Sequence, residues 1–307
     1  MPAHHEETLE NVVRELCSPA SYQSVAHRSN HEVPMPSIEA LKGILARLQS
    51  VLFPGYSGRS DLKPQTLRFH VGADLDEAYL ALSEQIERGL CFDCPREDLK
   101  NCPDCRERAQ GASAALIEAL PRVRRLLSTD VAAAFRGDPA AKSPGETIFC
   151  YPSILALTHY RLAHELERLE VPLIPRIITE IAHGATGIDI HPGARIGEYF
   201  FMDHGTGIVI GETCVIGANV RIYQGVTLGA KSFPLDDQGR PIKGVARHPV
   251  VEDDVIIYSG ATILGRVTIG KGSTIGGNVW LTKSIPPGSR IMQGRFQDVL
   301  FDQGSGI

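Results

Sequence analysis

Aliphatic residues recur at every sixth position through the C-terminal part of the chain. One series consists of Val251, Ile257, Ile263, Ile269, Ile275 and Leu281, and a second runs four residues behind it at Val255, Ala261, Val267, Ser273 and Val279. An earlier block has the same two phases, at Ile210, Ile216, Ile222 and Leu228 and at Cys214, Val220 and Val226. A period of six fits neither a helix nor one continuous strand, and ordinary sandwich strands would not hold it over five hexads. The pattern therefore predicts a parallel β-helix in which three hexads form one triangular coil.

The repeat is interrupted at two places. Ile190, Ile196, Met202 and Ile208 keep the period but are two residues out of phase with the later hexads, so the register slips between His204 and Ile210. Such a slip predicts a local distortion of the coil. Residues 231–249 break the period with proline, glycine and charged side chains, which predicts a loop that leaves the solenoid between coils. The run Pro286-Pro287-Gly288 ends the repeat.

The N-terminal half has helical periodicity instead. Its apolar positions predict helices over Ile38–Val51, Asp74–Leu90, Ala112–Leu127 and Ser153–Arg168. Asp74 and Ser153 stand where helix N-caps are expected. The predicted fold class is therefore α+β, with an N-terminal α-helical domain at residues 1–183, the β-helix at residues 184–288 and a C-terminal tail at residues 289–307.

Composition limits the classes of protein that this chain can be. Its 307 residues suggest two domains, and 43% hydrophobic with 22% charged residues is typical of a folded globular chain. The 31 basic and 36 acidic side chains leave a net charge of -5, which gives no broad positive field for nucleic acid or an anionic membrane. The first twenty residues contain no apolar export signal, and no apolar stretch approaches the length of a membrane span, so we expect a cytoplasmic protein.

Four of the seven cysteines lie within fifteen residues, as two C-x-x-C pairs formed by Cys91 with Cys94 and by Cys102 with Cys105. The odd total and this bunching differ from a secreted disulfide framework and fit a reducing compartment better. Four thiolates are enough to close a tetrahedral structural zinc site, although the spacer between the pairs is shorter than in common zinc ribbons. Redox-active or regulatory dithiols and inert packed thiols are the two alternatives.

Polar residues that do not suit an apolar solenoid gather where the register slips. Asp189 and His204 are fifteen residues apart, and a coil takes about eighteen residues, so the two side chains can lie on neighbouring coils within hydrogen-bond reach. A carboxylate that holds one imidazole nitrogen leaves the other to act as a general base. A lone histidine is usually structural, but Asp203 and several glycines surround this one, which favours a catalytic role.

Six short motifs resemble those of the serine acetyltransferases, a family of hexapeptide-repeat acyltransferases. They are D-I-H-P at Asp189–Pro192, M-D-H-G-T-G at Met202–Gly207, G-E-T at Gly211–Thr213, Q-G-V-T-L-G at Gln224–Gly229, R-H-P at Arg247–Pro249 and G-D-P-A at Gly137–Ala140. Generic hexapeptide transferases share the repeat but not this combination. The resemblance implies that the β-helix is left-handed and that the chain forms a homotrimer or a pair of trimers.

The resemblance also implies roles for individual residues. His204 would be the general base and Asp189 its orienting partner. The residues implied to contact L-serine are Asp138, Asp203, Arg247 and His248. The residues implied to line a groove for acetyl-CoA are Gly229, Ala230, Ser259 and Gly260. The implied reaction transfers the acetyl group of acetyl-CoA to the L-serine hydroxyl and gives O-acetyl-L-serine for cysteine biosynthesis.

Elementary chemistry agrees with these roles. A serine hydroxyl is a poor nucleophile at neutral pH, so the transfer needs a base within about 3 Å whose pKa lies near neutrality, and histidine is such a base. The resulting imidazolium can then protonate the departing CoA thiolate. Asp138 and Asp203 would complement the ammonium group of serine and Arg247 its carboxylate, although each charge taken singly could be a solvated surface group.

Other functions remain open from the sequence. A hexapeptide-repeat acetyltransferase could act on a sugar or another alcohol. A metal-dependent hydratase of the carbonic anhydrase type shares the β-helix and would use His191, His204 and His248 as ligands, but the repeats lack the close His-x4-His pair of that type. A binding protein that releases no CoA is a third class.

The chain ends in the segment Asp302–Ile307, whose glycines and serine offer little apolar surface for packing. The serine acetyltransferases that the chain resembles often end in a flexible tail whose terminal isoleucine enters the active site of O-acetylserine sulfhydrylase. We therefore expect Ile307 to bind that enzyme, because an apolar side chain beside a free carboxylate can imitate an amino-acid substrate.

Overall fold

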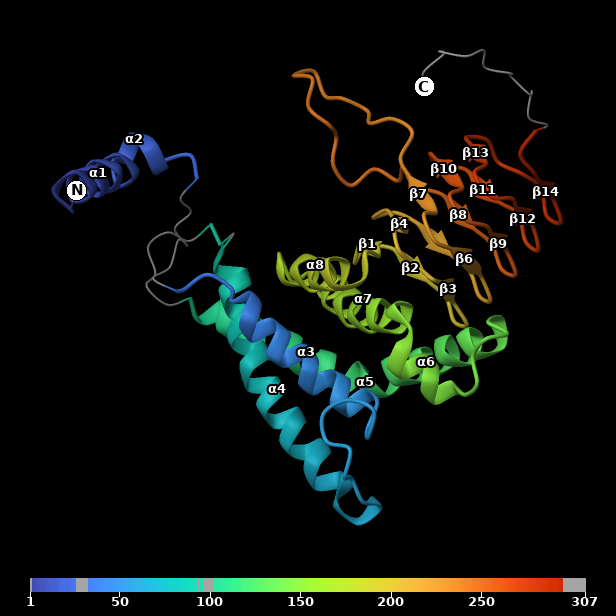
Figure 1. The fold of residues 1–307 in the computed structure, drawn as a ribbon, viewed down its shortest axis with the longest axis horizontal. Coiled ribbons are helices and arrows are strands. Elements are labelled where there is room, and N and C mark those ends of the chain that lie inside the picture. The colour runs from blue at the N-terminus through green and yellow to red at the C-terminus, as the bar shows by residue number, and fades with distance from the viewer. Residues whose placement is uncertain (1, 26–32, 93, 96–101, 295–307) are drawn as a thin grey trace.

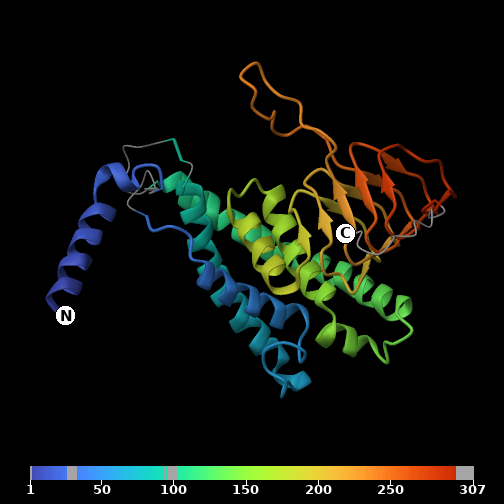
Figure 2. The same ribbon diagram turned by 45° about the horizontal axis from the view of Figure 1, so that its top comes forward.

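The computed structural model describes residues 2–25, 33–92, 94–95 and 102–294, and it consists of helices followed by a parallel β-helix (Figure 1). The helices are α1 Pro2–Leu16, α2 Pro19–Tyr22, α3 Ile38–Leu52, α4 Pro64–Phe92, α5 Pro103–Gly137, α6 Pro144–Cys150, α7 Pro152–Arg168 and α8 Ile174–Thr186. Helices α3, α4, α5 and α7 contain the four helices that periodicity predicts. Figures 1 and 2 show α1 and α2 standing apart from the other helices.

The predicted helix starts are wrong at two places, because prolines rather than the expected capping residues begin these helices. α4 begins at Pro64 and α7 at Pro152, so Asp74 lies inside α4 and Ser153 lies inside the first turn of α7. Proline is favoured in a first turn because its fixed φ suits a helix and its missing N–H would have no intrahelical partner there. α5 also begins at a proline, Pro103, and is longer than predicted at both ends.

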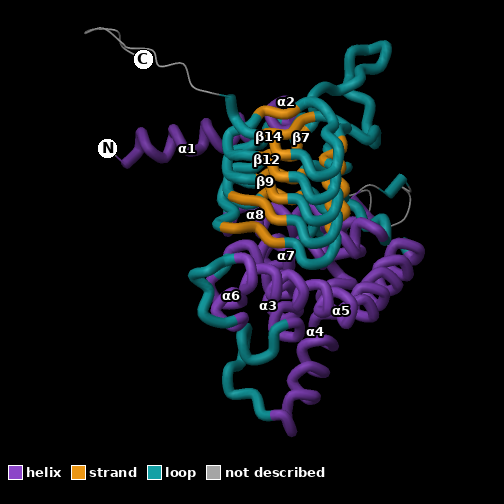
Figure 3. The backbone as a smooth tube through the Cα atoms, turned by 90° about the vertical axis from the view of Figure 1, so that its right-hand side faces the viewer, coloured by secondary structure: helices purple, strands orange, loops and turns teal. Residues whose placement is uncertain are grey.

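Short strands joined by turns form the β-helix, as the hexads predict. The strands are β1 Asp189–Ile190, β2 Arg195–Ile196, β3 Phe201–Asp203, β4 Val209–Ile210, β5 Val215–Ile216, β6 Arg221–Tyr223, β7 Thr227–Gly229, β8 Val250–Val251, β9 Ile256–Ile257, β10 Thr262–Leu264, β11 Thr268–Ile269, β12 Thr274–Ile275, β13 Trp280–Leu281 and β14 Arg290–Ile291. Within the described residues they form three parallel sheets: sheet A (β1-β4-β7-β10-β13), sheet B (β2-β5-β8-β11) and sheet C (β3-β6-β9-β12-β14). The chain visits the sheets in the order A, B, C, and Figure 3 shows the resulting coils stacked on one another.

The six-residue series point into the β-helix, and the strand register confirms the predicted slip. Ile257, Ile263, Ile269 and Ile275 of the first series and Val255 and Ala261 of the second are all buried. Ile190 pairs with Ile210, twenty residues on, whereas Ile210 pairs with Leu228, eighteen residues on. Met202 and Ile210 are both buried but stand eight rather than six positions apart. The turn after β3 therefore contains two extra residues.

A buried ion pair joins the helices to the first coil. Arg161 of α7 binds Asp130 of α5 through two hydrogen bonds of 2.7 and 2.8 Å, and both side chains are buried. The same guanidinium donates to the carbonyl of Gly197, and Asp130 accepts a hydrogen bond from the amide of Phe200. The apolar residues around this pair form one hydrophobic core that is continuous from α3 into the β-helix. The helices are thus held in a defined position against the solenoid.

The predicted domain boundaries lie near, but not at, the ends of these elements. The boundary between residues 183 and 184 falls inside α8, and β14 lies within the predicted tail. Residues 231–249 project from the solenoid between β7 and β8 as the predicted loop (Figure 2). Ile307 lies outside the described residues. Within the ranges given above, no helix combines the length and the apolar character that a membrane span needs.

Candidate active site

His204 lies in the turn that contains the two extra residues. The turns from sheet C to sheet A form one edge of the prism, here named the C–A corner, at residues 204–208, 224–226 and 258–261. His204 has a φ of 58°, and Gly205 and Gly207 have φ angles of 86° and 79°. A Cβ atom on Gly205 would lie 2.6 Å from Cδ1 of Ile188, so the turn needs glycine there. This backbone presents the His204 side chain to solvent, with 72% of it exposed.

Two carboxylates lie beside this imidazole. Oδ1 of Asp203 is 4.0 Å from Nε2 of His204. Asp138 is the C-cap of α5, and Gly137 before it packs so closely on β3 that a Cβ atom would lie 2.7 Å from the ring of Phe201. The glycine therefore lets the end of α5 approach the strand that carries Asp203. This packing brings the helical and solenoid parts of the site together.

Tyr151 is a site residue that the sequence analysis missed. Its hydroxyl donates a hydrogen bond to Oδ2 of Asp138, and the amide of Ala140 donates one of 2.8 Å to Oδ1. The hydrogen bond from Tyr151, then that from Ala140, and the nearby His204 hold the pKa of Asp138 below its ordinary value. Asp138 is thus kept as a carboxylate. The signal in the sequence is a tyrosine directly before Pro152, the residue that begins α7.

Asp189 does not contact His204 in the structure. Its Oδ1 atom is 3.7 Å from Nη1 of Arg176 on α8, and no hydrogen bond or ion pair joins it to His204 within the described part of the chain. Asp189 nevertheless begins β1 next to the His204 turn, because its amide donates to the carbonyl of Ile208. The orienting role of Asp189 therefore stays a prediction, and it requires one of the two side chains to turn.

Arg247 and His248 lie at a second edge, the A–B corner, which consists of the turns from sheet A to sheet B at residues 191–194, 211–214 and 230–249. Arg247 forms an ion pair of 2.6 Å with Glu212. The amide of Thr213 donates to Nδ1 of His248 at 3.1 Å, and a Cβ atom on Gly211 would lie 2.0 Å from the His248 ring. Burial, followed by the charge of Arg247, lowers the pKa of His248 to about 4, so this imidazole is neutral at pH 7.

The predicted serine-binding residues thus divide between two edges of the same sheet. Asp138 and Asp203 lie with His204 at the C–A corner, whereas Arg247 and His248 lie at the A–B corner. β4 of sheet A runs from the first corner to the second. A single chain therefore presents an acidic half-site with the imidazole and, across sheet A, a basic half-site.

A column of glycines rises along the C–A corner from the His204 turn. Gly207, Gly225 and Gly260 lie in successive coils with positive φ angles, and a Cβ atom on either of the first two would lie 3.5 to 3.6 Å from the backbone of the next. Beside the column, the rings of Tyr223 and Tyr258 stack at a centroid distance of 5.0 Å. The corner therefore offers bare backbone and aromatic faces to a long, thin ligand.

The predicted acetyl-CoA residues also divide between the two corners. Ser259 and Gly260 lie at the C–A corner, in the turn between β9 and β10. Gly229 ends β7, and Ala230 begins the loop at the A–B corner. Within one chain these residues do not line a common groove, because the strands of sheet A lie between them.

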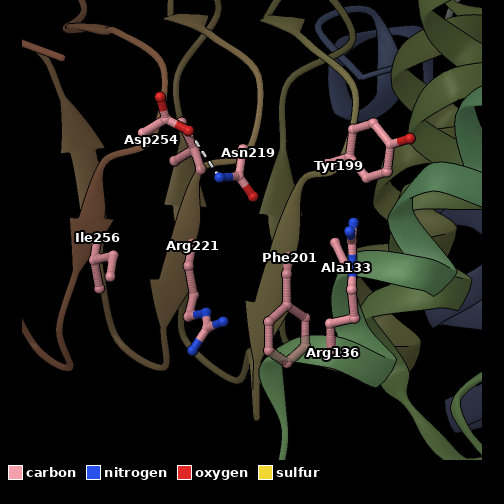
Figure 4. Close-up of a pocket in the computed structure, with 9 residues that line it drawn as sticks. Ala133, Arg136, Tyr199, Phe201, Asn219, Arg221, Asp254 and Ile256 are labelled. Atoms are coloured by element: carbon pink, nitrogen blue, oxygen red, sulfur yellow. Dashed lines mark hydrogen bonds between the residues drawn. The ribbon is translucent and has the colours of Figure 1, made fainter. Parts of the chain in front are cut away.

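A small hollow lies between α5 and sheet C (Figure 4). It is lined by Ala133, Arg136, Tyr199, Phe201, Asn219, Val220, Arg221, Asp254 and Ile256. The guanidinium groups of Arg136 and Arg221 lie over the rings of Tyr199 and Phe201, at 5.0 and 5.6 Å from the centroids. Phe201 and Asp203 share one face of β3, because they are two positions apart in a strand. The hollow is therefore lined by two guanidinium groups and by the carboxylate of Asp254.

Two groups of described side chains have the spacing of metal ligands. One consists of Cys94, Cys102 and Cys105, and the other of Glu180, His183 and Asp189. In the second group, Arg176 already pairs with both Glu180 and Asp189. His191, His204 and His248 belong to neither group, so within the described part of the chain the ligand set of a carbonic anhydrase type of site is not assembled.

The repeat and the fold define a hexapeptide-repeat transferase, since residues 248–283 match the family model of the bacterial transferase hexapeptide (six repeats). A comparison over the whole chain identifies the family within this class. It is 52% identical to the plasmid serine acetyltransferase of Synechococcus elongatus, over 97% of this chain and 95% of that relative. The chain therefore belongs to the serine acetyltransferase family.

Solved structures of this family share the fold. Serine acetyltransferase isoform 3 of Entamoeba histolytica, in complex with cysteine, has a TM-score of 0.72 and 31% identity, with 99% of this chain and 96% of that chain covered. The serine acetyltransferase of Brucella abortus, in complex with coenzyme A, has a TM-score of 0.54 and 26% identity, with 84% and 93% covered. The predicted fold class, an α-helical part followed by a left-handed β-helix, is thereby confirmed.

Proposed function

We propose that this protein transfers the acetyl group of acetyl-CoA to the hydroxyl of L-serine and so makes O-acetyl-L-serine for cysteine biosynthesis. The observation that carries the proposal is the exposed imidazole of His204, which stands beside two carboxylates at the foot of the glycine column. Membership of the serine acetyltransferase family supports L-serine as the acceptor. The coenzyme A bound to the Brucella abortus relative supports acetyl-CoA as the co-substrate.

His204 acts as the general base in this mechanism. It takes the proton from the serine hydroxyl while the oxygen attacks the carbonyl carbon of the acetyl group. A C–O bond to serine forms, the C–S bond to CoA breaks, and the imidazolium returns its proton to the CoA thiolate. One side chain therefore moves the proton in both halves of the reaction, and its exposure of 72% leaves room for both substrates.

Asp138 and Asp203 bind the ammonium group of serine. Both lie beside His204, so they would hold the amino acid with its hydroxyl next to the imidazole. The hydrogen bonds from Tyr151 and Ala140 favour the charged form of Asp138, the form that attracts an ammonium ion. Asp189 orients the imidazole once its carboxylate turns from Arg176.

We further propose that each active site is shared between two copies of the chain. Serine also has a carboxylate, and the Arg247 guanidinium that would bind it lies across sheet A from His204 in the same chain. If the A–B corner of one copy packs on the C–A corner of the next, Arg247 and His248 reach the acidic half-site. Gly229 and Ala230 then face Ser259 and Gly260 of the neighbour across a common groove for acetyl-CoA. Such a head-to-tail contact closes into a ring, which supports a trimer or a pair of trimers.

Mixing two inactive variants tests the shared site. His204→Ala and Arg247→Ala chains are each expected to be nearly inactive alone. Mixed trimers isolated after co-expression should regain activity, because in each mixed trimer one site combines an intact His204 with an intact Arg247. No recovery in isolated mixed trimers would show that each chain has its own complete site.

The release of thiol from acetyl-CoA tests the reaction itself. The assay is run with L-serine, with other hydroxy amino acids, with sugars and without an acceptor. We expect release that depends on L-serine. Release that depends on a sugar or another alcohol supports the alternative transferase, and no release with any acceptor supports a binding protein.

Binding to O-acetylserine sulfhydrylase remains a prediction from the sequence, since Ile307 lies outside the described residues. A titration of that enzyme with the full chain and with a chain that lacks Ile307 measures the contribution of the tail. Equal affinity of the two chains would mean that Ile307 does not bind the sulfhydrylase.

A further inference from the structure

The two C-x-x-C pairs converge where α4 ends and α5 begins. Cys91 lies in the last turn of α4, Cys102 is the N-cap of α5, and Cys105 lies in the first turn of α5. The exposed fractions of Cys91, Cys94, Cys102 and Cys105 are 0, 8, 2 and 4%, and each is a thiol rather than half of a disulfide. The Sγ atoms of Cys94, Cys102 and Cys105 all lie within 4.8 Å of one another. Cys91 is the fourth cysteine at this junction and is fully buried in the last turn of α4.

We propose that these four cysteines bind one structural zinc ion. Zn–S bonds of about 2.3 Å set tetrahedral sulfur ligands about 3.8 Å apart, so three sulfur atoms within 4.8 Å need to move by no more than about 1 Å to surround one ion. The thiol of Cys91, on the neighbouring helix, is the fourth ligand. With four protein ligands the site has no open position, which is typical of a structural rather than a catalytic zinc.

The cluster lies at the N-terminal end of α5. Cys102 is the N-cap of α5 and Cys105 lies in the first turn, so both residues belong to the N-terminal end of the helix. The positive end of the helix dipole lies at the same place. Negative charge is favoured at this end of a helix, which suits metal-bound thiolates better than packed neutral thiols.

Zinc binding would convert all four thiols to thiolates. Zinc replaces the protons: four thiols release four protons, and one Zn²⁺ with four thiolates leaves a net charge of −2. The amides at the start of α5 offset part of this negative charge.

The zinc ion would connect α4 and α5 at the end opposite the active site. α5 runs without interruption from Pro103, next to Cys102, to Gly137, next to Asp138. A zinc ion bound at the first turn of α5 would hold this helix against α4 and would take no part in acetyl transfer. The expected consequence of metal loss is therefore lower stability of the helical part, with the β-helix intact.

Metal analysis of the full chain, purified without added metal, tests the proposal. We expect about one zinc ion per chain in the wild type and in the control Cys150→Ser, whose cysteine is exposed and lies outside the cluster. Cys102→Ser and Cys105→Ser should each lose most of the zinc. Iron with inorganic sulfide, a mass lower by two hydrogens per disulfide, or metal-free chains with four titrating thiols would each overturn the proposal.

A second measurement does not depend on whether the serine variants fold. The wild-type chain is stripped of metal with a chelator and titrated with Co²⁺, which should give the absorption bands of tetrahedral thiolate coordination and saturate at about one equivalent. Addition of Zn²⁺ should displace the cobalt and raise the thermal unfolding midpoint. Absence of the thiolate bands would overturn the proposal, and bands unchanged in Cys91→Ser would overturn the assignment of the fourth ligand. Neither result depends on acetyl transfer.

Discussion

Oδ1 of Asp189 lies 3.7 Å from Nη1 of Arg176, so the carboxylate expected to orient His204 is paired with a guanidinium on α8. Arg176 also pairs with Glu180 and would keep a partner if Asp189 turned away. The carboxylate of Asp189 is therefore available to the imidazole at a small electrostatic cost. This arrangement makes the role of Asp189 testable separately from that of Asp203, which already lies beside His204.

Removal of the imidazole should stop most turnover. Loss of a general base typically costs on the order of 10²–10⁴ in rate, and we expect kcat of His204→Ala to fall within this range. The side chain is mostly exposed, so the fold should be unchanged in circular dichroism. A purified variant with near-wild-type kcat would show that His204 is not the general base.

The two neighbouring carboxylates should give different kinetic signatures. Asp189→Asn keeps the imidazole but weakens its orientation, so kcat should fall by less than in His204→Ala, with KM for serine little changed. Asp203→Asn removes a charge that binds the ammonium group, so KM for serine should rise more than kcat falls. Steady-state kinetics of both variants measures the difference. The opposite pattern would identify Asp203 as the orienting carboxylate.

Tyr151 should set the pH range in which serine binds. Tyr151→Phe removes the hydrogen bond that contributes most to the lowered pKa of Asp138, so this pKa should rise toward its ordinary value. Asp138 would then lose its charge at a higher pH, and KM for serine should increase first at the acidic end of the profile. The pH dependence of kcat/KM measures the shift, and Tyr79→Phe in α4 is a matched control. An acidic limb that does not move in Tyr151→Phe would leave the tyrosine with a purely structural role.

Sequence alone predicts the coils of the solenoid better than the contacts that bring distant side chains to the site. The hexads place Ile210 and Leu228 inside the prism because each coil repeats the same local geometry, and the slip at His204 is visible as a change of phase. The contact of Tyr151 with Asp138 could not be predicted, because it depends on how the end of α5 packs on β3. The number of residues between His204 and Arg247 also does not show that these two residues lie at different edges of the solenoid.

The ion pair between Asp130 and Arg161 should contribute much more to stability than surface pairs do. Asp130→Asn leaves the buried guanidinium of Arg161 without its counter-charge, and breaking a buried pair typically costs about 3–5 kcal/mol in the free energy of unfolding. Glu39→Gln, which removes the exposed pair with Lys42, is the control and should change little. Urea unfolding of the three chains measures both effects. Equal midpoints for Asp130→Asn and the wild type would mean that the pair does not hold the helices on the first coil.

His159 should make the fold sensitive to mild acid. Its imidazole is 7% exposed in α7, its Nδ1 atom has no hydrogen-bond partner within the described part of the chain, and burial lowers its pKa to about 4. The unfolded chain binds a proton near the ordinary pKa of about 6.5, whereas the folded chain does not until pH falls to about 4. This contribution to stability is therefore complete above pH 6.5 and is lost as pH falls from 6.5 to 4.

Replacement of His159 by an apolar side chain should remove that contribution. Between pH 7 and pH 5, protonation of an unfolded-state imidazole at its ordinary pKa lowers the free energy of unfolding by about 2 kcal/mol if the folded state stays neutral. His159→Leu should therefore lose about 2 kcal/mol less than the wild type over this interval. His248, whose pKa is also lowered to about 4, titrates in the same window and leaves a residual pH dependence in the variant. Urea unfolding at the two pH values measures the difference, and an equal loss in both chains would mean that His159 accepts a proton in the folded state.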